Sequence, residues 1–255
     1  MKTDLGLSGA VVLVTGGVRG VGRGITDVFL AHGAHVVTCA RHHAATDAEF
    51  RACDVRDETQ VEALIDGIVK DHGRLDVVVN NAGGAPYAPA ATGSPRLHDR
   101  VVQLNLLAPL LVSQRANAVM QRQAAGGSIV MISSVSGTRA SPGTAAYGAA
   151  KAGLDSLTAS LAVEWAPKVR VNALDVGMVR TEQAHLHYGS EAAVDAVGKT
   201  VPLGRLAEPA EVGACAAFLA SGLASYVSGA TLLVHGGGEV PAFLAAADVN
   251  QREDS

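Results

Sequence analysis

The chain has 255 residues, of which 48% are hydrophobic and 17% are charged, and its formal net charge is -4 at pH 7. These values are typical of a globular chain with one sizeable core and exclude an intrinsically disordered one. The slight acidity and the 4% of aromatic residues offer neither a basic surface nor a stacking platform, so nucleic acid is not expected as a partner.

Short apolar runs rich in β-branched residues alternate along the chain with segments of helical periodicity. We predict strands at residues 10–15, 35–40, 51–53, 75–79, 127–133, 168–173 and 230–234. Helices are predicted near residues 20–32, 57–72, 96–124, 145–166 and 209–220. This alternation indicates an α/β fold, a Rossmann-type doubly wound parallel sheet of about seven strands with helices on both faces. No repeat or linker interrupts the pattern, so residues 1–255 are predicted to form a single domain.

Polar or glycine-rich segments directly follow five of the predicted strands. They are the run Thr15-Gly16-Gly17-Val18-Arg19-Gly20-Val21-Gly22, Asp54, Asn80-Asn81-Ala82-Gly83, Ser133-Ser134 and Asp175-Val176-Gly177. In a doubly wound sheet, ligands bind beyond the carboxyl ends of the strands, so these segments are expected to line one site. In the first of them, Gly16, Gly20 and Gly22 allow a tight turn, and the helix that begins there presents free N–H groups to a pyrophosphate.

A tyrosine and a lysine four residues apart, Tyr147 and Lys151, are expected to lie on one face of a helix. A free tyrosine has a pKa of about 10, and a nearby cation lowers that pKa toward the range useful for acid/base catalysis. Ser134 ends a buried strand thirteen positions before Tyr147, which brings its hydroxyl toward the phenol at the strand-helix junction. We interpret the three residues as a catalytic group, in preference to an ordinary surface pair.

Asn105 lies in an otherwise helical stretch, four residues before Pro109. Proline has no N–H, so the carbonyl of Asn105 loses its helical donor. The sequence therefore predicts a kink and a carbonyl able to bind water, with a plain structural kink as the alternative.

Together these motifs resemble those of the short-chain dehydrogenase/reductase family, and the resemblance covers nearly the whole chain. The matching segments are TGGVRGVG at 15–22, CDV at 53–55, NNAG at 80–83, Asn105, ISS at 132–134 and YGAAK at 147–151. The resemblance implies that Tyr147 exchanges a proton with the substrate oxygen, that Ser134 orients this oxygen, and that Lys151 binds the nicotinamide ribose and tunes Tyr147. It also implies that Asn105 holds water in a proton relay to the lysine.

The end of the second predicted strand indicates which nicotinamide cofactor is bound. Ala40 stands where family members that prefer NAD usually carry an aspartate, and Arg41 follows it. Arg19 projects from the glycine-rich turn toward the same place. Two guanidinium groups suit a 2′-phosphate, so we predict NADP(H). NAD(H) is the alternative if Arg41 only stacks on adenine, or if the carboxylate of Asp47 or Glu49 reaches the ribose.

The resemblance implies further cofactor contacts. Asp54 is expected to bind the adenine amino group, and Asn81 to lie along the adenosine; the complete expected set is Gly16, Arg19, Gly20, Val21, Gly22, Arg41, Asp54, Val55, Asn81, Ala82, Gly83, Tyr147, Lys151, Gly177, Val179 and Thr181. The chain departs from the family at Val176, which replaces the usual proline, and at His235, which replaces a common aspartate. The first departure bears on the geometry of the nicotinamide pocket.

Two long connections, residues 84–95 and 178–202, are expected to enclose the substrate, the second as a lid. The apolar residues in them favour a hydrophobic ketone or alcohol, such as a 3-oxoacyl or steroid-like compound, and Arg139 is interpreted as a solvated surface residue. An NAD-dependent alcohol or hydroxysteroid dehydrogenase is an alternative. So are a dinucleotide-sensing protein without turnover, which would not need the Tyr147 proton donor, and a lyase or epimerase, for which we find no further acid/base groups.

The remaining expectations concern the chain as a whole. Its three cysteines have no metal-ligand spacing, and we expect no metal. The sequence shows no leader or membrane span, so a cytoplasmic location without membrane association is expected. In the family, the faces of the helices at 96–124 and 145–166 build a homotetramer, so a tetramer or dimer is expected here.

Overall fold

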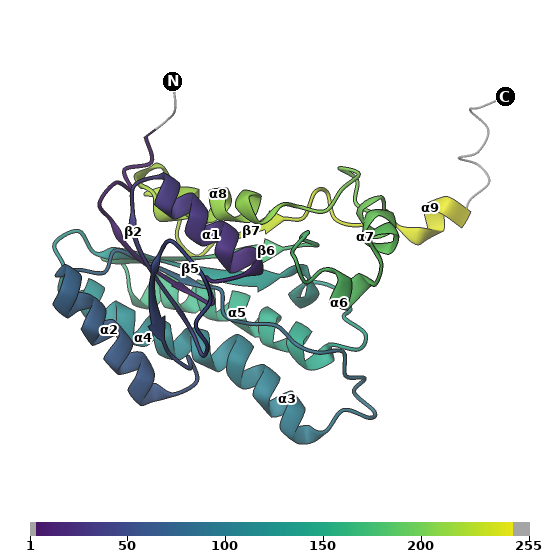
Figure 1. The fold of residues 1–255 in the computed structure, drawn as a ribbon, viewed down its shortest axis with the longest axis horizontal. Helices are drawn as coiled ribbons and strands as arrows, with labels where there is room; N and C mark the ends of the chain where they lie inside the picture. Colours follow the sequence, from purple (N-terminus) through teal and green to yellow (C-terminus); the bar gives the residue numbers. More distant parts are fainter. Residues whose placement is uncertain (1–3, 247–255) are drawn as a thin grey trace.

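The computed structural model describes residues 4–246, in which seven strands form one sheet in the order β3-β2-β1-β4-β5-β6-β7 (Figure 1). Every neighbouring pair is parallel. The strands are β1 (Val11–Thr15), β2 (His35–Ala40), β3 (Glu49–Ala52), β4 (Val77–Asn80), β5 (Gly127–Ser134), β6 (Val169–Val176) and β7 (Thr231–Val234). The predicted doubly wound sheet is confirmed. The order reverses between β1 and β4, and ligands of such sheets bind beyond the strand ends at this point.

Helices cover both faces of the sheet (Figure 1). On one face lie α1 (Gly20–Ala31) and α8 (Pro209–Ala220), and on the other lie α2 (Glu58–His72), α4 (Ala108–Met120) and α5 (Ala145–Glu164). Two separate apolar clusters fill the layers, with Ile25 and Phe29 of α1 completely buried in one and Met120 of α4 completely buried in the other. The apolar runs of the strands thus face helices on both sides, as their lack of alternation predicts.

The predicted helix at 96–124 is wrong as a single element. The structure has α3 (Pro95–Val102), a π-helical turn at Gln103–Leu107, and then α4. The Ala108 N–H donates to the Gln103 carbonyl, five residues back, because Pro109 offers no N–H to continue the regular ladder. The predicted break in the helix is therefore present, in the form of a π-turn; that the Asn105 carbonyl binds water stays a prediction.

The connection after β6 contains two short helices that the sequence did not reveal, α6 (His185–Tyr188) and α7 (Glu191–Gly198). The short helix α9 (Ala242–Ala246) was also not predicted. The role of residues 178–202 as a lid and the extent of the domain stay predictions, and residues 1–3 and 247–255 of the predicted domain lie outside the described residues.

Residues 4–246 contain neither a membrane-spanning helix nor a cluster of metal-ligating side chains. No helix there has the length and apolar character needed to cross a membrane. The same residues contain no group of three or more His, Cys, Asp or Glu side chains placed to hold a metal ion.

Candidate active site

The glycine-rich turn after β1 is closely packed against the segment after β4. Gly16 has φ +67°, a conformation that favours glycine, and a Cβ on Gly22 would lie 2.2 Å from the Gly16 carbonyl oxygen. The side-chain amide of Asn81 donates to the carbonyls of Thr15 and Gly16, at 3.0 and 3.2 Å. Asn81 therefore holds the turn in place, a structural role that the expectation of an adenosine contact did not include.

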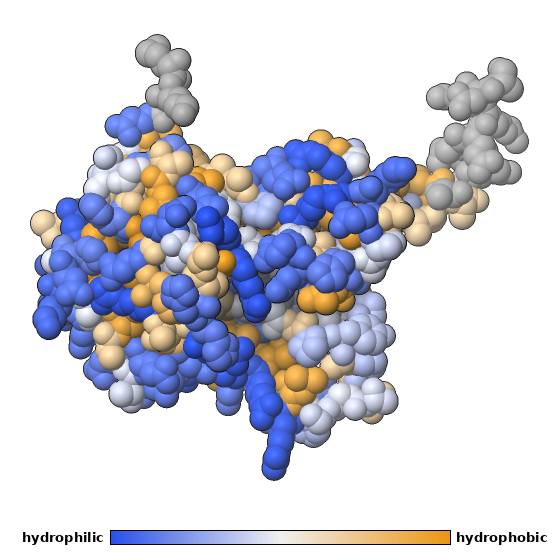
Figure 2. Space-filling view, viewed as in Figure 1, coloured by the Kyte–Doolittle hydropathy of each residue, from blue (hydrophilic) through white to orange (hydrophobic). Residues whose placement is uncertain are grey.

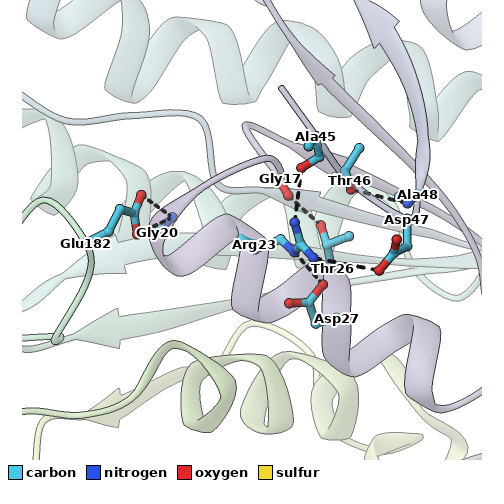
Figure 3. Close-up of polar contacts among 10 residues, drawn as sticks. All are labelled: Gly17, Gly20, Arg23, Thr26, Asp27, Ala45, Thr46, Asp47, Ala48 and Glu182. Carbon is cyan, nitrogen blue, oxygen red and sulfur yellow. Dashed lines mark hydrogen bonds and ion pairs between the residues drawn. The ribbon is translucent and has the colours of Figure 1, made fainter. Parts of the chain in front are cut away.

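The first N–H of α1 is already paired with a carboxylate (Figure 3). Both carboxylate oxygens of Glu182 accept from the Gly20 N–H, at 3.1 and 3.2 Å. Thr181 lies beside the same glycine, with its methyl group 3.6 Å from where a Cβ on Gly20 would stand. The connection after β6 thus closes onto the helix N-terminus, the part of the fold that binds phosphate groups. Glu182 was not among the predicted site residues, because its contact joins positions 162 apart.

Arg19 and Arg41 are both exposed, and within the described residues neither forms an ion pair or a side-chain hydrogen bond. A different arginine, Arg23, makes the local contacts: it binds Asp27 at 2.6 Å and donates to the Ala45 carbonyl at 3.1 Å (Figure 3). The two predicted guanidinium groups therefore have no protein anion to compete with a phosphate.

Asp47 and Glu49, the two carboxylates that could bind the ribose of NAD, both have partners within the protein. Glu49 binds Arg51 and His72, at 2.5 and 2.8 Å, and Asp47 faces Arg23 at 3.7 Å (Figure 3). Both carboxylates therefore have a cationic neighbour in the described residues.

Asp54 follows β3 as predicted, and it forms a two-bonded pair with Arg56, at 2.6 and 2.9 Å. Hydrogen bonding to Arg56 lowers the pKa of the Asp54 carboxyl, and the charge of Arg41 acts in the same direction. A carboxylate has about four acceptor sites, so the Arg56 pair leaves capacity for an adenine amino group. Val55, next in the chain, is buried.

The amide of Asn105 fixes the backbone that follows Gly83. Its oxygen accepts from the Gly84 N–H at 2.8 Å, and its nitrogen donates to the carbonyls of Gly84 and Val101, at 3.0 and 2.9 Å. A Cβ on Gly83 would lie 2.7 Å from this oxygen and 3.6 Å from Lys151 Nζ. The structure therefore brings Asn105, Gly83 and Lys151 together.

The predicted catalytic side chains also meet. Tyr147 and Lys151 lie one turn apart on α5, and Lys151 Nζ is 5.6 Å from the centroid of the Tyr147 ring. Lys151 Nζ donates to the Ile132 carbonyl of β5 at 2.6 Å, which fixes the buried ammonium group close to Ser134 at the end of that strand.

Burial dominates the titration of both groups on α5. It raises the pKa of Tyr147, against which hydrogen bonding with Ser134 acts in the opposite direction. Burial also lowers the pKa of Lys151 to about 8. In this arrangement the phenol oxygen of Tyr147 can donate or accept a proton, and the Ser134 hydroxyl and the Lys151 ammonium group lie beside it.

A cavity of about 350 Å³ opens next to Ser134, and Val135, Met178 and His235 form part of its wall. Arg139 and Glu239, also in the wall, form an ion pair at 2.6 Å. Arg139 is thus an exposed residue, as interpreted from the sequence, and it is paired with Glu239 at the cavity.

The face containing the site is hollowed between α1 and α6 (Figure 2). Of the predicted substrate loop at 84–95, Ala85, Pro86 and Ala88 lie in a small pocket that Tyr147 also lines.

Gly177, Val179 and Thr181, expected at the nicotinamide, all lie in the connection that closes onto α1. A Cβ on Gly177 would lie 2.8 Å from the Cβ of His235, and Val179 forms an isolated parallel bridge with Ala207. The residues present therefore fit a dinucleotide in three respects: a helix N-terminus that pairs with an anion, glycines that leave no room for a side chain, and two exposed guanidinium groups.

Comparisons with known proteins agree with this arrangement. A family model described as enoyl-(acyl carrier protein) reductase matches residues 16–239. D-threitol dehydrogenase from Mycolicibacterium smegmatis is 35% identical over 247 residues, which cover 92% of this chain and 94% of the relative. The ligand-free structure of an aldohexose dehydrogenase from Thermoplasma acidophilum is similar with a TM-score of 0.88 and 34% identity, covering 92% of this chain and 96% of that one.

One relative is much longer than this chain. An uncharacterized short-chain type dehydrogenase/reductase from Sinorhizobium fredii is 37% identical over 90% of this chain, which spans only 43% of that relative's length.

Proposed function

This chain belongs to the short-chain dehydrogenase/reductase family and is an NAD(P)-dependent oxidoreductase, and we propose that it transfers a hydride between NADP(H) and a secondary alcohol or ketone. The observation that carries the proposal is the meeting of Tyr147, Lys151 and Ser134 at the carboxyl end of β5.

In this proposal Tyr147 is the general acid/base. In the oxidation direction its phenolate takes the proton of the substrate hydroxyl, and in the reduction direction its phenol returns it. The Ser134 hydroxyl orients the substrate oxygen, and the Lys151 ammonium favours the phenolate. When bound, the nicotinamide supplies or accepts the hydride. Asn105 fixes the loop beside Lys151, and the relay of protons through water at its carbonyl is part of the proposal.

The preference for NADP(H) rests on charge at the end of β2. Ala40 leaves this position without a carboxylate, and Arg19 and Arg41 are exposed there. The N-terminus of α1 would hold the pyrophosphate, Asp54 the adenine, and the segment from Gly177 to Thr181 the nicotinamide. Comparison of kcat/KM with NADPH and NADH tests this part, and a strong preference for NADH would refute it.

The substrate class is the least constrained part. Residues 85–89 favour a hydrophobic ketone, whereas the cavity also presents Thr138, His235 and the Arg139–Glu239 pair, which can bind hydroxyl groups. The relatives named for threitol and aldohexoses agree with a polyhydroxylated substrate. A panel of sugar alcohols, aldoses and hydrophobic secondary alcohols, followed by nicotinamide absorbance, separates the two classes.

Replacement of Tyr147 by phenylalanine tests the proposed chemistry. The variant Tyr147→Phe should lose activity by about 100-fold or more while its cofactor affinity stays within about two-fold, since only the proton-transfer group is removed. Tyr226→Phe, at a fully exposed tyrosine, is the matched control and should behave as the wild type. Retained activity in Tyr147→Phe would refute the role of the phenol, and tight cofactor binding without turnover of any substrate by the wild type would favour the sensor.

A homotetramer is part of the proposal, because the family builds this assembly from faces of the helices on the α5 side of the sheet. Leu107 and Val163 are exposed on those faces, at 50% and 80%. Light scattering on the purified protein gives the assembly directly, and a monomer at micromolar concentration would refute it.

A further inference from the structure

A buried aspartate that the proposed mechanism does not use lies beneath the active site. Asp175 stands near the carboxyl end of β6, it is 0% exposed, and neither of its carboxylate oxygens has a hydrogen-bond donor within the described chain. Oδ1 of Asp155 is likewise buried without a donor. An ionised carboxylate without partners is costly to bury, so the surroundings of the two carboxyls must compensate for their charge.

The two carboxyls face each other across the junction of β6 and α5. Asp155 lies four residues after Lys151 on α5, so Tyr147, Lys151 and Asp155 form one stripe along that helix. Asp175 is in register with Ser133 of β5, which places both side chains on the same face of the sheet, toward α5. Each carboxyl affects the pKa of the other, as neighbouring groups at this junction do.

The other groups that face this pair are few. Lys151 lies beside both carboxyls from α5, His235 faces Asp175 from the segment after β7, and the Tyr147 phenol lies close enough to be affected by the charge of Asp175. The Ser133 hydroxyl donates to the Lys151 carbonyl at 3.3 Å and is therefore not free for either carboxyl. A proton held between the two carboxyls would supply the donor that these oxygens lack within the described chain.

The chemistry of such pairs is well defined. Two carboxylates in contact cannot both ionise at the ordinary pKa, because each charge disfavours the other, and the pair then holds one proton between its oxygens. Burial raises the pKa of Asp155 to about 6, and burial likewise raises the pKa of Asp175. The pair therefore holds its proton to a higher pH than an ordinary carboxyl does, and it titrates as a unit.

We propose that Asp155 and Asp175 share a single proton, and that release of this proton adds a second negative charge beside Lys151 and thereby tunes the Tyr147–Lys151 pair. The inference rests on the proposed catalytic roles of Tyr147 and Lys151. Asp155 and Asp175 are positioning residues, since neither reaches the cavity. A second negative charge makes Lys151 hold its proton more firmly and disfavours the Tyr147 phenolate, so the doubly ionised pair opposes alcohol oxidation.

Infrared difference spectroscopy tests the shared proton without any need for activity. In the wild type, the C=O band of a protonated carboxylic acid should be present at about pH 5 and disappear as the pH is raised, at a higher pH than for an ordinary carboxyl. In Asp155→Asn or Asp175→Asn the amide donates to the remaining carboxylate, which no longer shares a proton, so the band should be absent at about pH 5 in both variants. Persistence of the band in one of them would assign the proton to a single carboxyl and overturn the sharing.

The pH dependence of kcat/KM for alcohol oxidation tests the coupling to Tyr147. Asp155→Asn and Asp175→Asn each leave one negative charge beside Lys151. In each variant, the rising limb of the pH profile of kcat/KM should therefore lie about one pH unit lower than in the wild type. Asp66→Asn, at an exposed aspartate of α2, is the matched control and should leave the profile unchanged. Unshifted profiles in both single variants, or a shift reproduced by His235→Asn alone, would overturn the proposal. A wild type without activity would refute the proposed function, while the infrared result would still decide whether the proton is shared.

Discussion

The contact between Glu182 and the N-terminus of α1 predicts that this carboxylate competes with the dinucleotide for the Gly20 N–H. The Gly20 N–H is one of the orphan donors of α1, and in the proposed complex it faces the pyrophosphate. Glu182 now occupies it with both oxygens, at 3.1 and 3.2 Å. Binding of the cofactor must therefore displace this carboxylate, and the displaced segment is the one that carries Thr181.

The size of the effect follows from the exposure of the contact. A carboxylate at an exposed helix N-terminus contributes about 1 kcal/mol, because solvent screens the charge. Glu182→Gln keeps the shape and one acceptor oxygen but removes the charge, so it should weaken the blocking contact by up to about this amount. The dissociation constants of NADPH and NADP+ should accordingly fall by about 3- to 5-fold.

Calorimetric titration of the purified protein with NADPH measures the change directly. Glu62→Gln, which removes a negative charge from a surface ion pair of α2, is the matched control and should leave the affinity unchanged. An unchanged or weaker affinity in Glu182→Gln would show that the carboxylate does not compete with the cofactor, and the reasoning would then be wrong.

Three further predictions follow from contacts already described. Arg41→Ala should lower kcat/KM with NADPH by about 10-fold and leave the value with NADH within about two-fold, because one charge-assisted bond to the 2′-phosphate is lost; a parallel loss with NADH would contradict this. Gly22→Ala places a methyl group 2.2 Å from a backbone oxygen, so it should weaken NADPH binding by about 10-fold or more, whereas Gly222→Ala, which meets open space, should have no effect on the same titration. Lys151→Met should abolish activity yet raise the free energy of unfolding at pH 7 by about 1–2 kcal/mol. The variant no longer has the cost of burying the ammonium charge, and this cost is larger than the stabilisation lost with the hydrogen bond to the Ile132 carbonyl. The pKa of Lys151 is lower in the folded than in the unfolded protein, so the advantage should be largest below about pH 8 and shrink toward pH 10.5 in denaturant titrations, and an advantage that grows with pH would contradict the assignment.

The strands and the parallel, doubly wound type of sheet were predictable because they depend on local patterns, whereas the strand order was not predicted. Runs such as Leu75 to Val79 have no polar alternation, and a strand buried on both faces in a parallel sheet needs none. The site residues that end strands were predictable for the same reason, since parallel strands present their carboxyl ends at one edge. Pro109 likewise revealed the break in the helix, because its missing N–H is a local property.

The features that the sequence did not reveal depend on contacts between distant segments. Nothing in the run from Met178 to Pro202 distinguishes Glu182 from its neighbours, and its partner Gly20 lies 162 positions away. The ion pair of Arg139 with Glu239 is of the same kind, since either residue alone resembles a solvated surface charge. Helices α6 and α7 are too short for periodicity to identify them.

The departures of this chain from its family are concentrated beside the proposed proton-transfer group. His235 replaces a common aspartate, and it faces Asp175, which is buried one position before the Val176 that replaces the usual proline. Asp175 places a carboxyl on β6, where Asp155 and Lys151 meet it from α5. Charge at this depth acts through a low dielectric on Tyr147, so a small change of residue type alters the titration of the active site while leaving Ser134, Tyr147 and Lys151 in place.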